Sequence, residues 1–426
     1  MLKNINLKSE FLKSVVLLTS GTVLAQLIHF GFQPIVARLF ETSEIGELNY
    51  YLRIIAFIVS IGTLRYELSI PLPKKDAHAF QIVRIALTIA FFVFLLFIIG
   101  SVVYALFTDN FPITVLYNMI IGLIIFFSVF RNVGLNYAIR KKWFRSISYS
   151  KTIGALGMSL SKVGAGLLSM GSFGLLLATL LGVIAGTVVY LKQFFSENKL
   201  EVNQSSAPKQ RALLKEHKDF PRLNLPHTLI DTGREVLIAI LFVAYFGKDV
   251  FGSFSFGLMI MSLPLALIGT TIGQAFFQKA SEMYNNKLPL YTMLRKTTLI
   301  LTALSIIPFL ILFLYGDDLF AWVFGEKWRH AGQIVEVLTP WIALKFVSSP
   351  ISTIPLIIKK QKLFFWLGLI NSLLQLGILY FLPLKFGFSS QSVLTVIQIL
   401  SFTLSAYLIV VIFIKLICVK ASDKLI

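Results

Sequence analysis

The amino-acid sequence predicts an all-α integral membrane protein, and three observations lead to this fold class. Hydrophobic residues make up 56% of the 426 residues, only 14% are charged, and the mean hydropathy is +0.81. These values are typical of membrane proteins rather than soluble domains. The apolar residues form about twelve runs of roughly twenty residues, the length that crosses a hydrocarbon core of about 30 Å. Lys and Arg fill every second loop between these runs.

The predicted spans follow one another with short connections, except in the middle of the chain. We place them at residues 14–37, 45–70, 80–107, 113–138, 148–168, 173–192, 222–246, 250–277, 295–316, 333–358, 362–383 and 391–417. The first run is too long for the apolar core of a signal peptide, so we expect it to stay as the first span. The polar stretch over residues 196–219 is rich in Lys, Glu, Asn, Gln and Ser, and we interpret it as a cytoplasmic linker.

This linker divides the chain into an N-terminal six-helix bundle over residues 1–195 and a C-terminal six-helix bundle over residues 220–426. A weak internal repeat supports the division, because residues 40–50 align without gaps with residues 246–256 at apolar and glycine positions. An even number of spans in each half places such repeats in parallel orientation, about an axis along the membrane normal.

The distribution of positive charge predicts the orientation in the membrane. Outside the apolar runs, only five basic residues fall in one set of alternating loops: Arg38, Lys248, Lys327, Arg329 and Lys385. Cytoplasmic loops retain Lys and Arg, so both termini are expected in the cytoplasm. A net charge of +19 would suggest nucleic-acid binding in a soluble protein. Here we attribute it to topology and to contact with anionic lipid headgroups, and we expect no nucleic-acid partner.

The charged residues inside the predicted spans include more cations than anions. A charge near the bilayer centre costs about 3 kcal/mol on insertion scales, so it needs a partner or a water-filled cavity. Five cations are therefore candidates for lining a substrate lumen: Arg53, Arg131, Lys162, Arg234 and Lys345. Such a lumen suits an anionic cargo such as a phosphate or pyrophosphate headgroup. In the alternative interpretation, these cations pair with backbone carbonyls, helix C-termini or lipid phosphate.

Three titratable residues are candidates for coupling transport to an H⁺ or Na⁺ gradient: His29, Asp231 and Glu235. Asp231 and Glu235 share a helix face with Arg234 because of their i, i+3 and i+4 spacing. Either Arg234 neutralises one carboxylate and the set holds two helices together, or the second carboxylate takes up a proton or gates a cavity. Glu235 aligns with His29 at the repeat offset, which fits either coupling or coincidence.

No residue pattern typical of an enzyme or of a cofactor site is present in the sequence. It lacks a Walker-type Gly-Lys-Ser/Thr loop, and its five histidines and single Cys418 have no metal-ligand spacing. One cysteine also excludes an intrachain disulfide. We therefore predict a transporter without a cofactor or a bound metal. Gly182 and Gly186 form a Gly-x-x-x-Gly pair, which we interpret as a site of close helix packing.

Three segments in the first third of the chain carry recognisable motifs: residues 37–46 (ARLFETSEIG), residues 62–75 (GTLRYELSIPLPKK) and residues 136–144 (NYAIRKKWF). They resemble bacterial polysaccharide flippases of the O-antigen (Wzx) type, in the multidrug/oligosaccharidyl-lipid/polysaccharide exporter superfamily. The resemblance implies two six-helix bundles in a V-shaped, MATE-like arrangement, the fold of multidrug and toxic-compound extruders and of the lipid II flippase. It also implies that Arg65 and Glu67 matter for the fold or for substrate entrance.

The same resemblance implies a function. The expected cargo is an oligosaccharide repeat on undecaprenyl pyrophosphate, moved from the cytoplasmic to the outer leaflet of the bacterial inner membrane for O-antigen or capsule assembly. Partners would be the lipid-linked oligosaccharide, membrane lipids, a polysaccharide polymerase and glycosyltransferases. Two alternatives stay open. A multidrug or metabolite antiporter of the same fold would favour a lumen with excess carboxylates, whereas a membrane glycan polymerase or ligase would need a longer exported loop.

Overall fold

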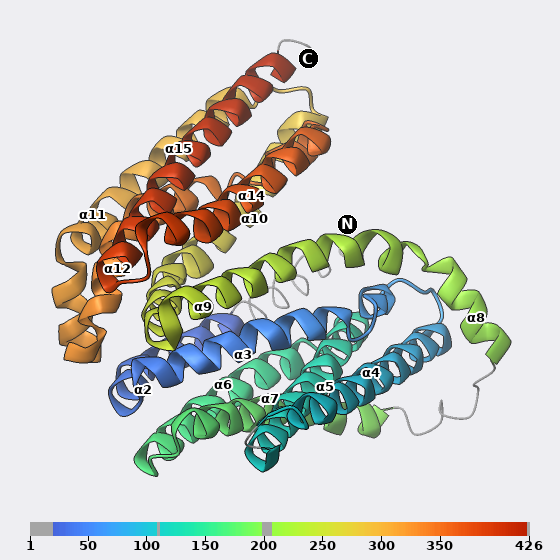
Figure 1. Cartoon of the computed structure of the whole chain (residues 1–426). Coiled ribbons are helices and arrows are strands. Elements are labelled where there is room, and N and C mark those ends of the chain that lie inside the picture. The colour runs from blue at the N-terminus through green and yellow to red at the C-terminus, as the bar shows by residue number, and fades with distance from the viewer. Residues whose placement is uncertain (1–19, 109–110, 198–206, 424–426) are drawn as a thin grey trace. The chain divides into compact units, whose positions relative to one another are not determined.

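The computed structural model describes residues 20–108, 111–197 and 207–423, and these residues are helical with no β-strand among them. The chain divides into two compact units, Met1–Val236 and Leu237–Ile426. Figure 1 shows both as bundles of long helices. The predicted all-α fold class is confirmed. The division at a linker over residues 196–219 stays a prediction, and part of that linker lies outside the described residues.

The first unit consists of helices that begin and end near the predicted spans. In chain order they are a helical segment over residues 20–31, α2 (Gln33–Leu39), α3 (Thr42–Ile61), the 3₁₀ turn η1 (Tyr66–Ser69), α4 (Asp76–Ala105), α5 (Phe111–Lys141), α6 (Phe144–Leu167), α7 (Gly171–Glu197), α8 (Ala207–Glu216), the π-helical η3 (Phe220–Asn224) and the start of α9 (Leu225–Pro264). Residues 14–19 of the predicted first span lie outside the described residues.

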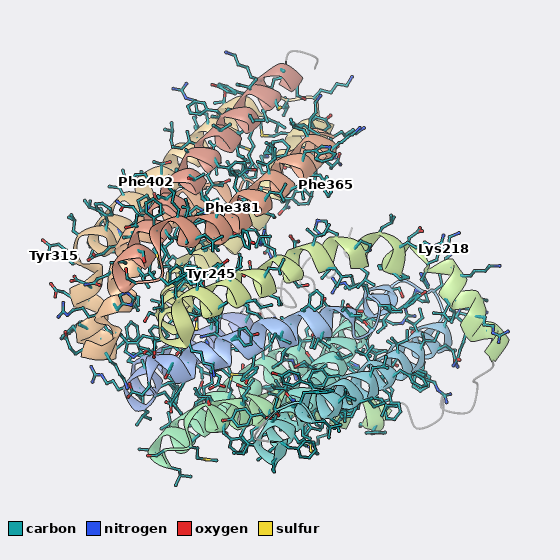
Figure 2. All side chains as sticks on the ribbon, in the orientation of Figure 1. Lys218, Tyr245, Tyr315, Phe365, Phe381 and Phe402 are labelled. Atoms are coloured by element: carbon teal, nitrogen blue, oxygen red, sulfur yellow. The ribbon has the colours of Figure 1, made fainter. Side chains whose placement is uncertain are left out.

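The second unit continues from α9. Its further elements are the π-helical η4 (Leu265–Gly269), α10 (Thr270–Asn285), α11 (Tyr291–Phe324), the 3₁₀ turn η5 (Glu326–Trp328), α12 (Arg329–Ser348), α13 (Ile354–Ile357), α14 (Gln361–Phe386) and α15 (Ser390–Asp423). Large aromatic side chains on its outer surface suit contact with lipid. Phe365, Phe381 and Phe402 are 50%, 66% and 63% exposed, and Figure 2 labels all three.

Seven helices among the described residues are long and apolar enough to cross a membrane by length and composition. One of these stretches, Phe220–Pro264, has 45 residues, about 67 Å of helix at 1.5 Å per residue, or twice the thickness of a hydrocarbon core. Gly247 has a φ of +82° within it, a conformation that glycine adopts readily. The backbone therefore leaves the helical conformation where the sequence predicts the turn between the seventh and eighth spans. The count of twelve spans stays a prediction.

The predicted tenth span, residues 333–358, is not one continuous helix. Helix α12 ends at Ser348, and the chain resumes a helical course only in the short α13. Pro350 lies in the break, and proline both lacks an N–H donor and disfavours the helical conformation of the residue before it. The predicted span therefore contains a break at Pro350, whereas Pro340 is accommodated inside α12.

Glycines allow α6 and α7 to pack closely, as the Gly182–Gly186 pair predicts. A Cβ added to Gly154 would lie 3.2 Å from the Gly182 carbonyl oxygen. A Cβ added to Gly186 would lie 2.9 Å from the Ser150 carbonyl oxygen. The Ser150 hydroxyl donates a 2.7 Å hydrogen bond to the Gly186 carbonyl across this contact. The packing interpretation of the glycine pair is confirmed, and the contact fixes the helices that carry the site described next.

Helix α8, in the predicted linker, is anchored to the first unit. Leu213 is 5% exposed and packs in an apolar cluster with residues of α4 and α5. The Tyr66 hydroxyl donates to the Leu214 carbonyl at 3.3 Å, and the Gln210 side-chain amide donates to the Gln81 amide oxygen at 3.1 Å. This part of the polar stretch is therefore a docked helix.

Candidate functional site: a cationic cavity in the first unit

The first unit contains a cavity of about 430 Å³ between the first helix, α5, α6 and α7. Its lining is mixed: apolar side chains come from the first helix, α5 and α6, and polar groups converge from all four elements. The polar lining residues are Thr22, Gln26, His29, Arg131, Asn132, Ser150, Lys151 and Tyr190. No described residue that lines the cavity is an Asp or a Glu. The cavity is therefore positively charged and rich in hydrogen-bond donors.

Arg131 and Lys151 supply this charge. Arg131 on α5 is half-buried, and the glycine at position 186 leaves room for it, because a Cβ there would lie 3.6 Å from the Arg131 Cδ. Lys151 on α6 donates a 2.8 Å hydrogen bond to the Thr22 hydroxyl of the first helix. Since a hydroxyl is a neutral acceptor, the Lys151 charge is not compensated through this bond. Both cations can therefore attract an anion into the cavity.

Lys162 lies on the same face of α6 as the cavity lining. Lys151, Ala155 and Met158 line the cavity, and Lys162 continues their helical spacing of three and four residues. Its side chain is buried, with 8% exposed, and it interacts electrostatically with His29. His29 lines the cavity and makes a 3.2 Å hydrogen bond to the amide of the buried Gln33. Of the residues predicted for the site, the structure thus groups Arg131, His29 and Lys162.

Arg53, Arg234 and Glu235 form a separate group where α3 meets the start of α9. Arg53 forms an ion pair with Glu235, and the other Glu235 oxygen accepts a 3.0 Å hydrogen bond from Arg234 Nη2. One carboxylate therefore joins two guanidinium groups. This geometry supports the interpretation in which the charged cluster holds two helices together. None of the three residues lines the cavity described above.

Asp231 lies apart from this group. Its carboxylate is 3.6 Å from the ring of His227, one helical turn earlier, and its side chain is 55% exposed. The sequence predicts a shared helix face for Asp231 and Glu235, but their carboxylates have different partners. Glu235 turns toward Arg53 on α3, whereas Asp231 lies beside His227.

Arg65 and Glu67 occupy the turn after α3. Their side chains form an ion pair at 3.3 Å, and Glu67 is 5% exposed. The Thr63 hydroxyl also donates to Glu67. Arg65 has a φ of +66°, a left-handed conformation that costs free energy in a residue with a side chain. These contacts fix a strained turn, in keeping with a role in the fold.

Lys345 belongs to the second unit. Its side chain is exposed, and its Nζ lies 5.4 Å from the centre of the Trp341 ring, an attractive cation–π distance. The residues predicted for one lumen therefore fall into three places among the described residues: the cavity of the first unit, the Arg53–Glu235 pair, and α12.

The sequence-based selection omits two cations. Lys151 lies at the start of a span, so its position in the sequence groups it with the basic loop before it. Its i, i+7 and i+11 spacing with Met158 and Lys162 could have indicated that the three share a helix face. Lys415 on α15 is only 3% exposed and donates to the Ser348 carbonyl and hydroxyl at 3.2 and 3.1 Å. It binds the last residue of α12, a role that sequence spacing does not reveal. Within the described part of the chain, no group of three His, Cys, Asp or Glu residues could hold a metal ion.

Comparison with known families identifies the chain at the level of its family. The family model described as "Polysaccharide biosynthesis protein" matches residues 73–333, which is more than half of the sequence. The chain belongs to this family. The match confirms the resemblance noted in the sequence, and it extends from α4 into α12. No curated protein matches the chain.

Solved structures of membrane transporters have the same fold at low sequence identity. An inward-facing multidrug resistance MATE family transporter of the MOP superfamily gives a TM-score of 0.70 at 14% identity, over 94% of this chain and 96% of that chain. A MATE transporter in complex with MaL6 gives 0.63 at 15% identity, over 97% of each chain. A MOP superfamily transporter from Pyrococcus furiosus Vc1 (DSM3638), reported to have a binding pocket of reverse polarity, gives 0.59 at 14% identity over 96% of each chain. These similarities confirm the MATE-like fold.

Proposed function

We propose that the protein is a flippase for lipid-linked oligosaccharides, which binds the diphosphate of its cargo in the cationic cavity of the first unit. One observation carries this proposal. Arg131, Lys151 and His29 line a cavity in which no described lining residue carries a carboxylate. An anion entering the cavity therefore meets donors and cations without displacing an internal counter-ion.

The family and the fold restrict what the anion is. Members of this family take part in polysaccharide biosynthesis, and the fold is that of membrane transporters. Surface polysaccharides are assembled from saccharides carried on a lipid diphosphate. A diphosphate is therefore an anion that fits both the family and the transporter fold. The cargo would move from the cytoplasmic to the outer leaflet of the inner membrane, and its lipid would remain in the bilayer. Guanidinium groups bind phosphate oxygens in bidentate fashion, which favours Arg131 as the main contact.

The cavity also suggests how transport is coupled to an ion gradient. His29 is the one predicted coupling residue that lines the cavity, so a proton gradient acting through His29 is the coupling we propose. Glu235 already binds two arginines, and Asp231 faces outward beside His227. A polymerase and glycosyltransferases remain the proposed partners, because a flippase receives a finished repeat unit and releases it for polymerisation.

A multidrug antiporter is the second candidate of the same fold, and the charge of the cavity disfavours it. Organic cations are bound by carboxylates and aromatic faces, whereas this cavity holds cations. Purified protein in proteoliposomes distinguishes the two functions. We expect translocation of a lipid diphosphate oligosaccharide, measured by access of an added glycosidase to the sugar, and no pH-driven uptake of ethidium. Ethidium uptake without sugar translocation would refute the flippase.

A further inference from the structure

The segment between α7 and α9 carries a row of exposed basic residues, which we call the basic stripe. Arg211 and Lys215 lie on α8, Lys218 in the turn after it, and Arg222 in η3. Their spacing of i, i+4, i+7 and i+11 is that of one helix face. All four are exposed, and no described carboxylate forms an ion pair with any of them. Residues 207–224 contain five basic residues and two carboxylates, so the segment has a net positive charge.

Helix α8 lies across the end of the first unit. Leu213 packs in a cluster with residues of α4 and α5, and the Leu214 carbonyl accepts a hydrogen bond from Tyr66. Figure 1 shows α8 at a steep angle to the long helices, near one end of α4. Successive residues of an α-helix are about 100° apart, so Arg211 and Lys215 lie about a third of a turn from this docked face. The basic stripe, whose Lys218 is labelled in Figure 2, therefore faces sideways at the end of the bundle.

Exposed leucines lie next to the basic stripe. Leu223 follows Arg222 and is 69% exposed, and Leu72, in the chain after η1, is 59% exposed. The two segments are neighbours, because η1 contacts η3 and Arg222 interacts electrostatically with Tyr66 of η1. Basic residues beside exposed apolar side chains are typical of helices that lie in the membrane interface, where cations bind headgroups and apolar groups enter the acyl boundary. The combination favours a lipid surface over a soluble anion.

We propose that the basic stripe binds the anionic phospholipid headgroups of the cytoplasmic leaflet, with Leu223 inserted beneath them. Charge complementarity supports this occupant, because cytoplasmic leaflets carry anionic lipids that attract basic segments near the membrane surface. Since η3 continues directly into α9, lipid bound at the stripe would also fix the point where α9 begins. The inference goes beyond the proposed function and does not depend on the identity of the cargo.

The test places a fluorophore at the edge of the basic stripe. Cys418 is the only cysteine of the chain, so Leu223→Cys in a Cys418→Ser background gives one labelling site, where an NBD group takes the place of the leucine. The full-length protein is placed in nanodiscs of phosphatidylcholine, with a phosphatidylcholine quencher that is spin-labelled close to the headgroup. A second set of nanodiscs also contains phosphatidylglycerol. We expect at least threefold stronger quenching in the second set, and no increase when soluble glycerol phosphate is added to the first.

Removal of the charges should abolish this difference. The variant carries Arg211→Gln, Lys215→Gln and Lys218→Gln. Each basic residue near an anionic surface contributes about fivefold to binding, so the loss of three should weaken it about 100-fold. Quenching in the variant should then be the same with and without phosphatidylglycerol. High salt should have the same effect on the unsubstituted stripe, because the Debye length falls to about 3 Å at 1 M, and this measurement does not depend on how a variant folds.

A matched control removes three exposed lysines around the start of α14, through Lys359→Gln, Lys360→Gln and Lys362→Gln. Quenching by phosphatidylglycerol nanodiscs should be unchanged in this control. Equal quenching in both sets of nanodiscs, or full quenching in the variant without the stripe charges, would show that the charges do not bind lipid and would overturn the inference. Absence of quenching in both sets would place the stripe in water or against an acidic protein, and it would also overturn the inference while the flippase proposal stands.

Discussion

Arg131→Gln should weaken the binding of inorganic pyrophosphate more than any other single substitution in the cavity. The guanidinium is half-buried and borders a cavity without described carboxylates, so a bound phosphoryl group would not compete with an internal acceptor. Hydrogen bonds to charged groups contribute about 1.5–3 kcal/mol, which corresponds to a loss of about 10- to 150-fold in affinity. Arg131→Lys keeps the charge but loses the bidentate geometry, so its affinity for pyrophosphate should fall between those of wild type and Arg131→Gln.

The assay is titration of purified protein with pyrophosphate, with thermal unfolding as the check on folding. Arg145→Gln is the matched control, because Arg145 is an exposed arginine at the start of α6 that does not line the cavity. Its affinity for pyrophosphate should stay within about twofold of wild type. Equal losses in the two variants would show that general positive charge attracts the anion. Unchanged binding by Arg131→Gln would refute the assignment of the site.

Three further predictions concern stability and coupling. Gly182→Val should lower the thermal unfolding temperature, because the new Cβ would lie 2.5 Å from the Met158 Cβ and overpacking costs about 1–3 kcal/mol. Gly164→Ala should leave the unfolding temperature unchanged, because nothing lies within 4 Å of a Cβ added there. An equal effect of both substitutions would contradict the packing account. His29→Gln should impair gradient-driven transport, measured as translocation against imposed pH, because His29 is the predicted coupling residue that lines the cavity. An unchanged dependence on pH would argue against its proton role. Trp328→Ala should destabilise the protein by about 3–5 kcal/mol in thermal unfolding, since Trp328 is fully buried with its ring 4.2 Å from that of Phe256; a normal melting temperature would contradict this.

Much of the fold follows from the sequence because hydrophobic length is a strong local signal. The predicted span at residues 113–138 corresponds to α5, Phe111–Lys141, and the predicted span at 362–383 corresponds to α14, Gln361–Phe386. Helices in lipid must satisfy their own backbone hydrogen bonds, so an apolar run of this length has few other structures to adopt. The turn predicted after residue 246 is also marked locally, because the backbone leaves the helical conformation at Gly247.

The features that sequence reasoning missed depend on contacts between distant residues. Arg53 pairs with Glu235, 182 positions away, and no local spacing indicates such a pair. The end of α12 at Ser348 depends on how prolines are accommodated, since proline within a membrane helix is compatible with either a kink or a break. The sequence predicts that the cavity is positively charged, but it does not predict which residues line it. Arg131 and His29 line it and Lys162 interacts with His29, whereas Lys345 lies on a helix of the other unit.

The central claim is that the protein translocates a lipid-linked oligosaccharide through a site that includes Arg131. The most direct test is made in a deletion strain that carries either a wild-type or an Arg131→Gln plasmid copy. Lipid-linked repeat units in the membrane and the same glycan at the cell surface are quantified together. We expect lipid-linked repeats to accumulate and surface glycan to be lost in the deletion strain, with both restored by the wild-type copy and not by an equally expressed Arg131→Gln copy. Unchanged levels of both pools after deletion, or full restoration by Arg131→Gln, would contradict the account.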